Sequence, residues 1–114
     1  MKTIVFDFDG VIHKYSKGWQ GSYDIYDEPV PGIKDVIEEL RRSYKVVIVS
    51  TRCSKARGRK EILNWLDRYG IMVDDVLEEK PPAICYIDDR AICFDGNTKT
   101  LIDKIKNFKT WREE

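Results

Sequence analysis

Oxygen-bearing side chains follow three apolar runs of this sequence, at the point where each run ends. They belong to Asp7 and Asp9, to Ser50 and Thr51, and to Asp88 and Asp89. A lysine, Lys80, precedes the last of these runs. If the runs are strands of an open parallel sheet, the groups converge beyond its carboxyl edge, where such sheets bind ligands. Carboxylates, hydroxyls and one ammonium together are typical of a site for phosphate and a hard cation such as magnesium.

The spacing of Asp7 and Asp9 indicates a division of labour between two carboxylates. Residues two apart on a strand point to the same side. If the chain turns at Gly10, both carboxylates face one pocket and the backbone carbonyl of Asp9 is presented there as well. One carboxylate can then attack phosphorus while the other handles the proton of the leaving group.

The elements that must position these side chains are those of an α/β fold. Runs of strand length span 3–8, 45–50, 73–77 and 83–87, and a fifth short strand is expected at 91–94. Helical spacing of apolar residues predicts one helix from Pro31-Gly32 to Leu40, one over 54–69 before Gly70, and one over 98–108. Strands that alternate with helices favour a mainly parallel sheet covered on both faces. We expect residues 1–114 to form one domain.

Residues 11–30 differ in kind from the rest of the chain. They are rich in turn residues and aromatic side chains but have no long apolar face. We expect a small hairpin or flap over the end of the first strand. Its aromatics, Trp19, Tyr23 and Tyr26, either stack on a base or pack against the core or a neighbouring subunit. His13, the only histidine, is expected on the flap surface.

Composition bounds the function without deciding it. Twenty basic and twenty acidic residues cancel, so the global charge points neither to nucleic acid nor to a membrane surface. Three cysteines without CxxC spacing favour reduced thiols in a cytoplasmic protein. No signal-like segment precedes the first strand, and no apolar run approaches the roughly 18 residues of a membrane span, so we expect no membrane partner.

Four sequence elements, taken in order, resemble the motifs of the haloacid dehalogenase superfamily. They are Asp7-Phe8-Asp9-Gly10-Val11 after an apolar strand, Ser50 after a second, then Lys80, then Asp88-Asp89. The strings Ser50-Thr51-Arg52 and Ile87-Asp88-Asp89-Arg90 resemble the small uncapped phosphatases, including the phosphatase part of phage polynucleotide kinase-phosphatases. The resemblance covers residues 3 to about 94. It implies a three-layer Rossmann-like sandwich with a minimal flap and no large cap domain.

The resemblance also implies the catalytic roles. Asp7 is the nucleophile and forms an aspartyl-phosphate. Asp9 protonates the leaving oxygen and then activates water, and the presence of Asp9 favours a phosphatase over the family's dehalogenases. Ser50 holds a phosphoryl oxygen, with Thr51 next to it as the alternative. Lys80 neutralises charge on Asp7 and on the phosphate.

A magnesium ion is the cofactor that this resemblance implies. Asp88 binds it together with Asp7 and the carbonyl of Asp9, and Asp89 assists through a metal-bound water or by orienting Lys80. Positioning and charge neutralisation then supply most of the catalysis, as in phosphoryl transfer generally. Arg52 and Arg90 are candidates for contact with the substrate.

The substrate remains open at this point. A capless site suits large substrates such as nucleic-acid ends or phosphoproteins, or a partner subunit that closes the pocket. A homo-oligomer is a further partner to consider. Nucleotides and polynucleotide ends are the leading candidates. The alternative from another class is a non-catalytic module of the same fold that binds magnesium or phosphate and regulates a partner.

Overall fold

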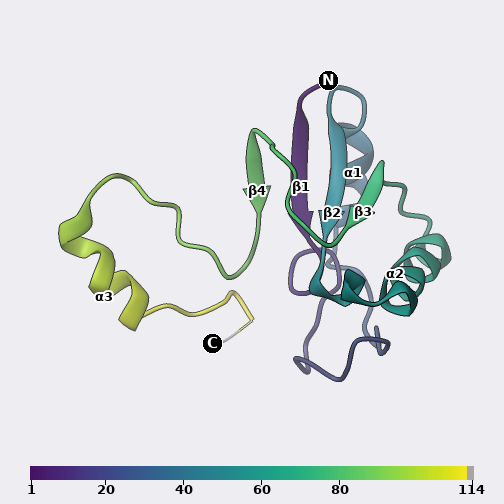
Figure 1. Cartoon of the computed structure of the whole chain (residues 1–114), viewed down its shortest axis with the longest axis horizontal. Helices are drawn as coiled ribbons and strands as arrows, with labels where there is room; N and C mark the ends of the chain where they lie inside the picture. Colours follow the sequence, from purple (N-terminus) through teal and green to yellow (C-terminus); the bar gives the residue numbers. More distant parts are fainter. Residues whose placement is uncertain (113–114) are drawn as a thin grey trace.

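Four strands form an all-parallel sheet in the order β3-β2-β1-β4 (Figure 1). The computed structural model describes residues 1–112. The strands are β1 (Thr3–Asp7), β2 (Lys45–Val49), β3 (Asp75–Leu77) and β4 (Cys85–Ile87), which confirms the four main predicted strands. In register, Ile4 of β1 lies opposite Val46 of β2 and Cys85 of β4. All four carboxyl ends therefore meet at one edge of the sheet.

Helices α1 (Ile33–Leu40) and α2 (Ala56–Tyr69) bury their apolar stripes against one face of this sheet. Ile37 from α1 and Ile62 and Trp65 from α2 join a single buried cluster with alternate residues of β1 and β2. Gly70 ends α2 in the left-handed conformation (φ 67°), as the sequence predicts, because a residue without a Cβ adopts it at little cost.

The opposite face of the sheet has a smaller core. Val5, Val47 and Val49 are buried there, and Leu77 and Ala83 pack against them. Both packing residues lie at the ends of the β3–β4 connection, which runs across the sheet in Figure 1. This connection, rather than α1 or α2, covers the second face.

The flap after β1 is an irregular loop rather than the hairpin that was one of the two predicted forms. Its pairing is confined to isolated bridges, and side chains hold it together. Ser16 donates to Asp27 (2.5 Å), and the Tyr26 hydroxyl donates to the carbonyl of Gly18 (2.8 Å). The indole of Trp65 donates to the Asp27 carbonyl (3.0 Å), which ties the flap to α2. These hydrogen bonds fix the flap at the carboxyl edge of the sheet.

The chain after β4 leaves the sheet and returns to it. The expected fifth strand at 91–94 is wrong, because this segment runs away from β4 and finds no strand to pair with. The helix predicted over 98–108 is shorter: a 3-10 turn, η2 (Thr98–Thr100), leads into α3 (Leu101–Lys106). Figure 1 shows α3 standing apart from the sheet. We call residues 90–110 the C-terminal finger.

None of the helices within residues 1–112 combines the length and the apolar character needed to cross a membrane.

Candidate functional site

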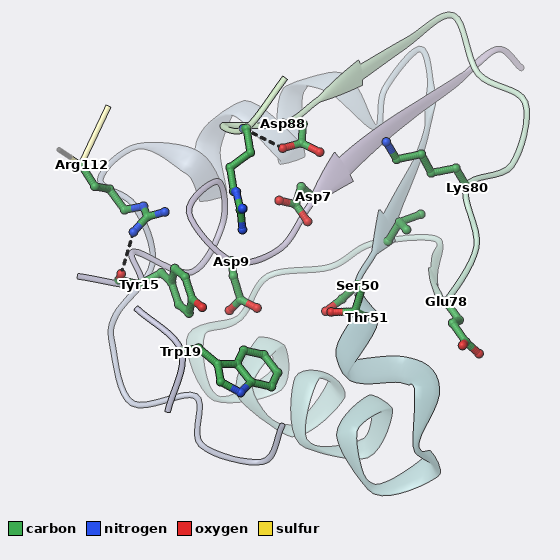
Figure 2. A pocket seen from close by; sticks show the side chains of 12 residues that line it. Asp7, Asp9, Tyr15, Trp19, Ser50, Thr51, Glu78, Lys80, Asp88 and Arg112 are labelled. Carbon is green, nitrogen blue, oxygen red and sulfur yellow. Dashed lines mark hydrogen bonds between the residues drawn. The ribbon is translucent and has the colours of Figure 1, made fainter. Parts of the chain in front are cut away.

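A cavity of about 440 Å³ opens at the carboxyl edge of the sheet (Figure 2). It collects seven of the nine predicted site residues. The lining residues are Asp7, Asp9, Tyr15, Trp19, Val49, Ser50, Thr51, Glu78, Lys80, Asp88, Arg90 and Arg112. The two predicted residues that do not line it are Arg52 and Asp89, and both lie directly behind residues that do.

Asp7 ends β1 and points into the cavity (Figure 2). Burial and the neighbouring carboxylates of Asp88, Asp89 and Asp9 raise its pKa from 3.8 to about 7, although a hydrogen bond from the Phe8 backbone acts in the opposite direction. A carboxyl group with a pKa raised in this way has too little positive charge nearby to stabilise its ionised form.

Three carboxylates come together behind Asp7. Ligand atoms of Asp7, Asp88 and Asp89 lie within 4.8 Å of one another. The Asp89 side chain is only 1% exposed, and its buried Oδ1 has no hydrogen-bond partner. A buried carboxylate oxygen without a hydrogen-bond partner is available to bind a cation, and an all-oxygen donor set suits magnesium. The residues present therefore fit the metal that the sequence predicts.

Gly10 makes this cluster sterically possible. Its φ of 84° lies in the left-handed region, and a Cβ at this position would collide with the carboxylate of Asp89. The tight turn follows from the same residue, because Val11, Ile12 and His13 all donate backbone hydrogen bonds to the carbonyl of Phe8. The predicted turn at Gly10 is confirmed.

The Asp9 carboxylate is held apart from the acidic cluster by two partners. His13 Nδ1 lies 2.8 Å from Asp9 Oδ1, and Arg52 Nε lies 2.9 Å from Asp9 Oδ2. The backbone N–H of Asp27 donates to His13 Nε2 (3.1 Å), so Nδ1 carries the proton and donates to Asp9. Burial alone would raise the pKa of Asp9, but the hydrogen bonds from His13 and Arg52 outweigh it and lower the pKa.

His13 and Arg52 therefore lie elsewhere than the sequence predicts. His13, expected on the surface, is fully buried between Phe8, Tyr26 and Trp65. Arg52, expected at the substrate, is also 0% exposed. Besides Asp9, its guanidinium donates to two flap carbonyls, those of Gly21 (2.8 Å) and Ser22 (3.0 Å). Both residues therefore hold the Asp9 carboxylate in position from the protein interior.

Ser50 and Thr51 both line the cavity at the end of β2. Ser50 is buried, and its Oγ accepts from the backbone N–H of Arg52 (3.1 Å), which caps the 3-10 turn η1 (Thr51–Ser54). Gly58 lets α2 pack against η1, since a Cβ there would collide with the carbonyl of Arg52. Both residues therefore face the cavity, but Thr51 is exposed, whereas the Ser50 hydroxyl is buried and held by the backbone of η1.

Two of the predicted cationic residues, Lys80 and Arg90, line the cavity. Lys80 follows β3, and Figure 2 shows its amino group directed toward Asp7 and Asp88. Its Nζ also lies 5.4 Å from the ring centre of Tyr86. Arg90 lines the cavity, and its backbone N–H donates to Asp88 Oδ1 (2.8 Å), which fixes the turn after β4.

Arg112 is the main site residue that the sequence did not indicate. Its Nη2 lies 3.2 Å from Asp89 Oδ2, and its guanidinium stacks on the ring of Tyr15 at 4.9 Å. Next to it, the indole of Trp111 donates to the carbonyl of Gly10 (2.6 Å). The return of the finger thus places an arginine beside the acidic cluster. No local sequence pattern signals this, because the contact joins residues 23 positions apart through a loop.

No family model, curated protein or solved structure matches this chain.

Proposed function

We propose that this chain is a magnesium-dependent phosphatase of the haloacid dehalogenase type, which hydrolyses a phosphomonoester through an aspartyl-phosphate on Asp7. The observation that carries the proposal is the half-buried Asp7 beside Asp88 and Asp89 at the carboxyl edge of a parallel sheet. Asp9, Ser50 and Lys80 line the same cavity. Membership of that superfamily and its three-layer Rossmann-like architecture are part of the proposal.

In the first step, a carboxylate oxygen of Asp7 attacks phosphorus and the bond to the ester oxygen breaks. Asp9 gives its proton to the leaving oxygen, so an alcohol departs and the phosphoryl group stays on Asp7. In the second step, water attacks phosphorus and gives a proton to Asp9, and inorganic phosphate leaves Asp7. Ser50 and Lys80 hold the phosphoryl oxygens throughout, because both line the cavity that contains Asp7.

Asp7, Asp88 and Asp89 are the side chains that would hold magnesium, together with the carbonyl of Asp9. When bound, the cation would add positive charge to a cluster in which only Asp89 has a cationic partner, Arg112, and it would attract the phosphate. The lowered pKa of Asp9 favours the carboxylate form, which accepts the proton of water in the second step. The first step uses the protonated form of Asp9, which each turnover regenerates when water gives its proton to Asp9. His13 and Arg52 hold that carboxylate in place.

A nucleotide or a polynucleotide end is the substrate class that we favour. Trp19 is 52% exposed at the cavity wall, where its ring lies 4.9 Å from the guanidinium of Arg52. A half-exposed indole beside a phosphate site offers a surface on which a base can stack. Lys55 and Arg57 lie over Tyr23, which belongs to the same flap as Trp19, and add positive charge for a phosphate backbone.

A phosphatase screen tests the proposed function. We expect the protein to release phosphate from an aryl phosphate, and from nucleotides or phosphorylated oligonucleotides more efficiently than from sugar phosphates. Turnover should fall to background in EDTA and return with added magnesium. Asp88→Asn should need a much higher magnesium concentration, whereas Asp95→Asn, an exposed carboxylate on the finger, should behave as wild type. A protein that binds magnesium and phosphate but turns over no member of the panel would support the regulatory-module alternative instead.

Arg112→Ala is expected to raise KM about tenfold at saturating magnesium while kcat changes less than about threefold. The reason is that a hydrogen bond to a charged group contributes about 1.5–3 kcal/mol, and Arg112 faces the cavity without touching Asp7 or Asp9. Steady-state kinetics on one nucleotide measures this. Lys109→Ala, which removes an exposed cation from the same segment, is the matched control. An unchanged KM in Arg112→Ala would remove this residue from the substrate site.

A further inference from the structure

Two consecutive residues after the C-terminal finger, Trp111 and Arg112, reach the acidic cluster from the other end of the chain. Trp111 Nε1 donates to the carbonyl of Gly10 (2.6 Å), which lies 101 positions earlier in the sequence. Arg112 pairs with Asp89 through Nη2 (3.2 Å). The pair of residues therefore contacts both the turn after β1 and the turn after β4, and these two turns carry the carboxylates of the cluster.

The two oxygens of the Asp89 carboxylate have different surroundings. Oδ2 accepts from Arg112 Nε (3.4 Å) and Nη2 (3.2 Å), and it lies so close to Gly10 that a Cβ there would collide with it. Oδ1 is buried and has no hydrogen-bond partner within residues 1–112. Asp89 is thus held between Gly10 and Arg112 by one oxygen, and the other oxygen stays available for a cation.

Arg112 is itself fixed by the flap. Its Nη1 donates to the carbonyl of Tyr15 (3.4 Å), and its guanidinium stacks on the ring of Tyr15 at 4.9 Å (Figure 2). Tyr15 has a φ of 60° and is the only non-glycine residue in the described part of the chain with a positive φ. An aromatic residue adopts this conformation at a cost that its contacts must offset. The contacts with Tyr15 fix the direction in which Arg112 approaches Asp89.

An arginine beside a metal ligand has two opposing effects on metal affinity. Its positive charge repels a cation, whereas its hydrogen bonds orient the ligand. Carboxylates that bind a metal usually accept such hydrogen bonds, and loss of the donor typically lowers metal affinity 10–100-fold. Arg112 contacts Oδ2 of Asp89 and leaves Oδ1 uncovered, and Asp7 and Asp88 add two more carboxylates to the cluster. We therefore expect orientation to outweigh repulsion at this site.

We propose that Trp111 and Arg112 are positioning residues of the metal centre, which hold Asp89 against Gly10 so that its Oδ1 is directed at the magnesium ion. The inference rests on the proposed function, because it takes the acidic cluster to be a magnesium site. It gives the return of the chain after the finger a part in metal affinity. This part is separate from any contact of Arg112 with the substrate, since it concerns the protein before substrate binds.

Calorimetric titration of the whole chain with magnesium chloride, without substrate, tests this role. Arg112→Gln should raise the magnesium dissociation constant about tenfold. Trp111→Phe keeps an aromatic ring but lacks the N–H donor, and it should raise the constant about threefold. Lys109→Gln removes an exposed charge from the same segment and should bind as wild type. Urea unfolding with and without magnesium gives a second readout, because the stabilisation by magnesium falls as its dissociation constant rises. A purely structural role would lower stability equally in both conditions.

A double-mutant cycle with Asp89→Asn shows whether Arg112 acts through Asp89. Asp89→Asn alone should raise the magnesium dissociation constant at least about tenfold, and adding Arg112→Gln should change it less than about twofold further. Magnesium binding as tight as wild type or tighter in Arg112→Gln, or fully additive effects in the cycle, would overturn this inference alone. A wild type that binds no magnesium would overturn the proposed metal site with it. A wild type that binds magnesium but hydrolyses no phosphoester would count against the proposed phosphatase, and the variants would still decide the role of Arg112.

Discussion

Asp7→Asn is expected to abolish phosphatase turnover and, in the absence of magnesium, to make the protein more stable. The activity should fall at least about 10³-fold, because the amide lacks the nucleophilic carboxylate that the proposed first step requires. The stability should rise because the substitution removes an ionisable group whose pKa is raised to about 7 by burial and by the neighbouring carboxylates. We expect about 1–2 kcal/mol after allowing for solvent screening.

The stability gain of Asp7→Asn should depend on pH with a definite sign. The folded wild type binds a proton at Asp7 up to about pH 7, whereas the unfolded chain releases it near pH 3.8. Wild-type stability is therefore lost as the pH rises between these values, and the variant is spared this loss. The difference in Tm should be small at pH 4 and largest above pH 7, and magnesium should narrow it by stabilising the wild type.

Differential scanning fluorimetry at several pH values, with and without magnesium, measures this effect. Asp24→Asn, an exposed carboxylate in the flap, is the matched control and should show neither the activity loss nor the pH-dependent gain. An Asp7→Asn protein with wild-type turnover would exclude the proposed nucleophile. A variant that is inactive but no more stable at pH 8 would instead count against the electrostatic strain at Asp7.

Arg52→Met should be the most destabilising substitution near the site, at about 3–5 kcal/mol. Removing the guanidinium leaves the Asp9 carboxylate with only His13 as a partner, in a place where Arg52 is completely buried. It also leaves the carbonyls of Gly21 and Ser22 without their donor, so the flap loses its attachment to η1. Methionine keeps much of the side-chain volume, so the lost hydrogen bonds dominate.

Urea unfolding of Arg52→Met against Arg57→Met measures the effect. Arg57 is exposed and stacks on Tyr23 at 4.2 Å, so its replacement should cost less than about 1 kcal/mol. The lowered pKa of Asp9 means that its contribution is present above about pH 4 and lost below it, so the penalty of Arg52→Met should shrink in acid. Asp9→Asn should restore part of the loss at neutral pH. Equal stability of the two arginine variants would contradict the buried ion pair.

The strand ends were predictable from the sequence because their signals are local. An apolar run stops at Asp7, another at Ser50 and a third at Asp88, and the rule that parallel strands align their carboxyl ends brings these residues together. Gly10 and Gly70 were predictable for the same reason, since each marks a turn within its own segment. The same local signals failed in the C-terminal finger, where the strand expected at 91–94 is absent and the helix expected over 98–108 is shorter.

What was missed depends on which distant surface covers a residue. His13 is buried only because the backbone of Asp27 and the ring of Trp65 close over it, 14 and 52 positions away. Its position after Ser50 predicts that Arg52 contacts the substrate. In the structure its guanidinium instead donates to Asp9 and to flap carbonyls, which the local sequence does not indicate. The spacing of Ile102 and Ile105 predicts an apolar helical face without indicating whether its own sheet receives it.

The sequence separation of the paired strands also indicates the order in which they form during folding. β1 and β2 pair across about 40 residues, whereas β4 must join the outer side of β1 from about 80 residues away, and the Trp111–Gly10 contact closes a separation of 101. Closing a longer loop costs more chain entropy, so we expect the pairing of β1 with β2 and α1 to form first on the folding pathway. The carboxylates of Asp88 and Asp89 then arrive late at Asp7. Their mutual repulsion is thus met only after most of the core is already in place to hold them.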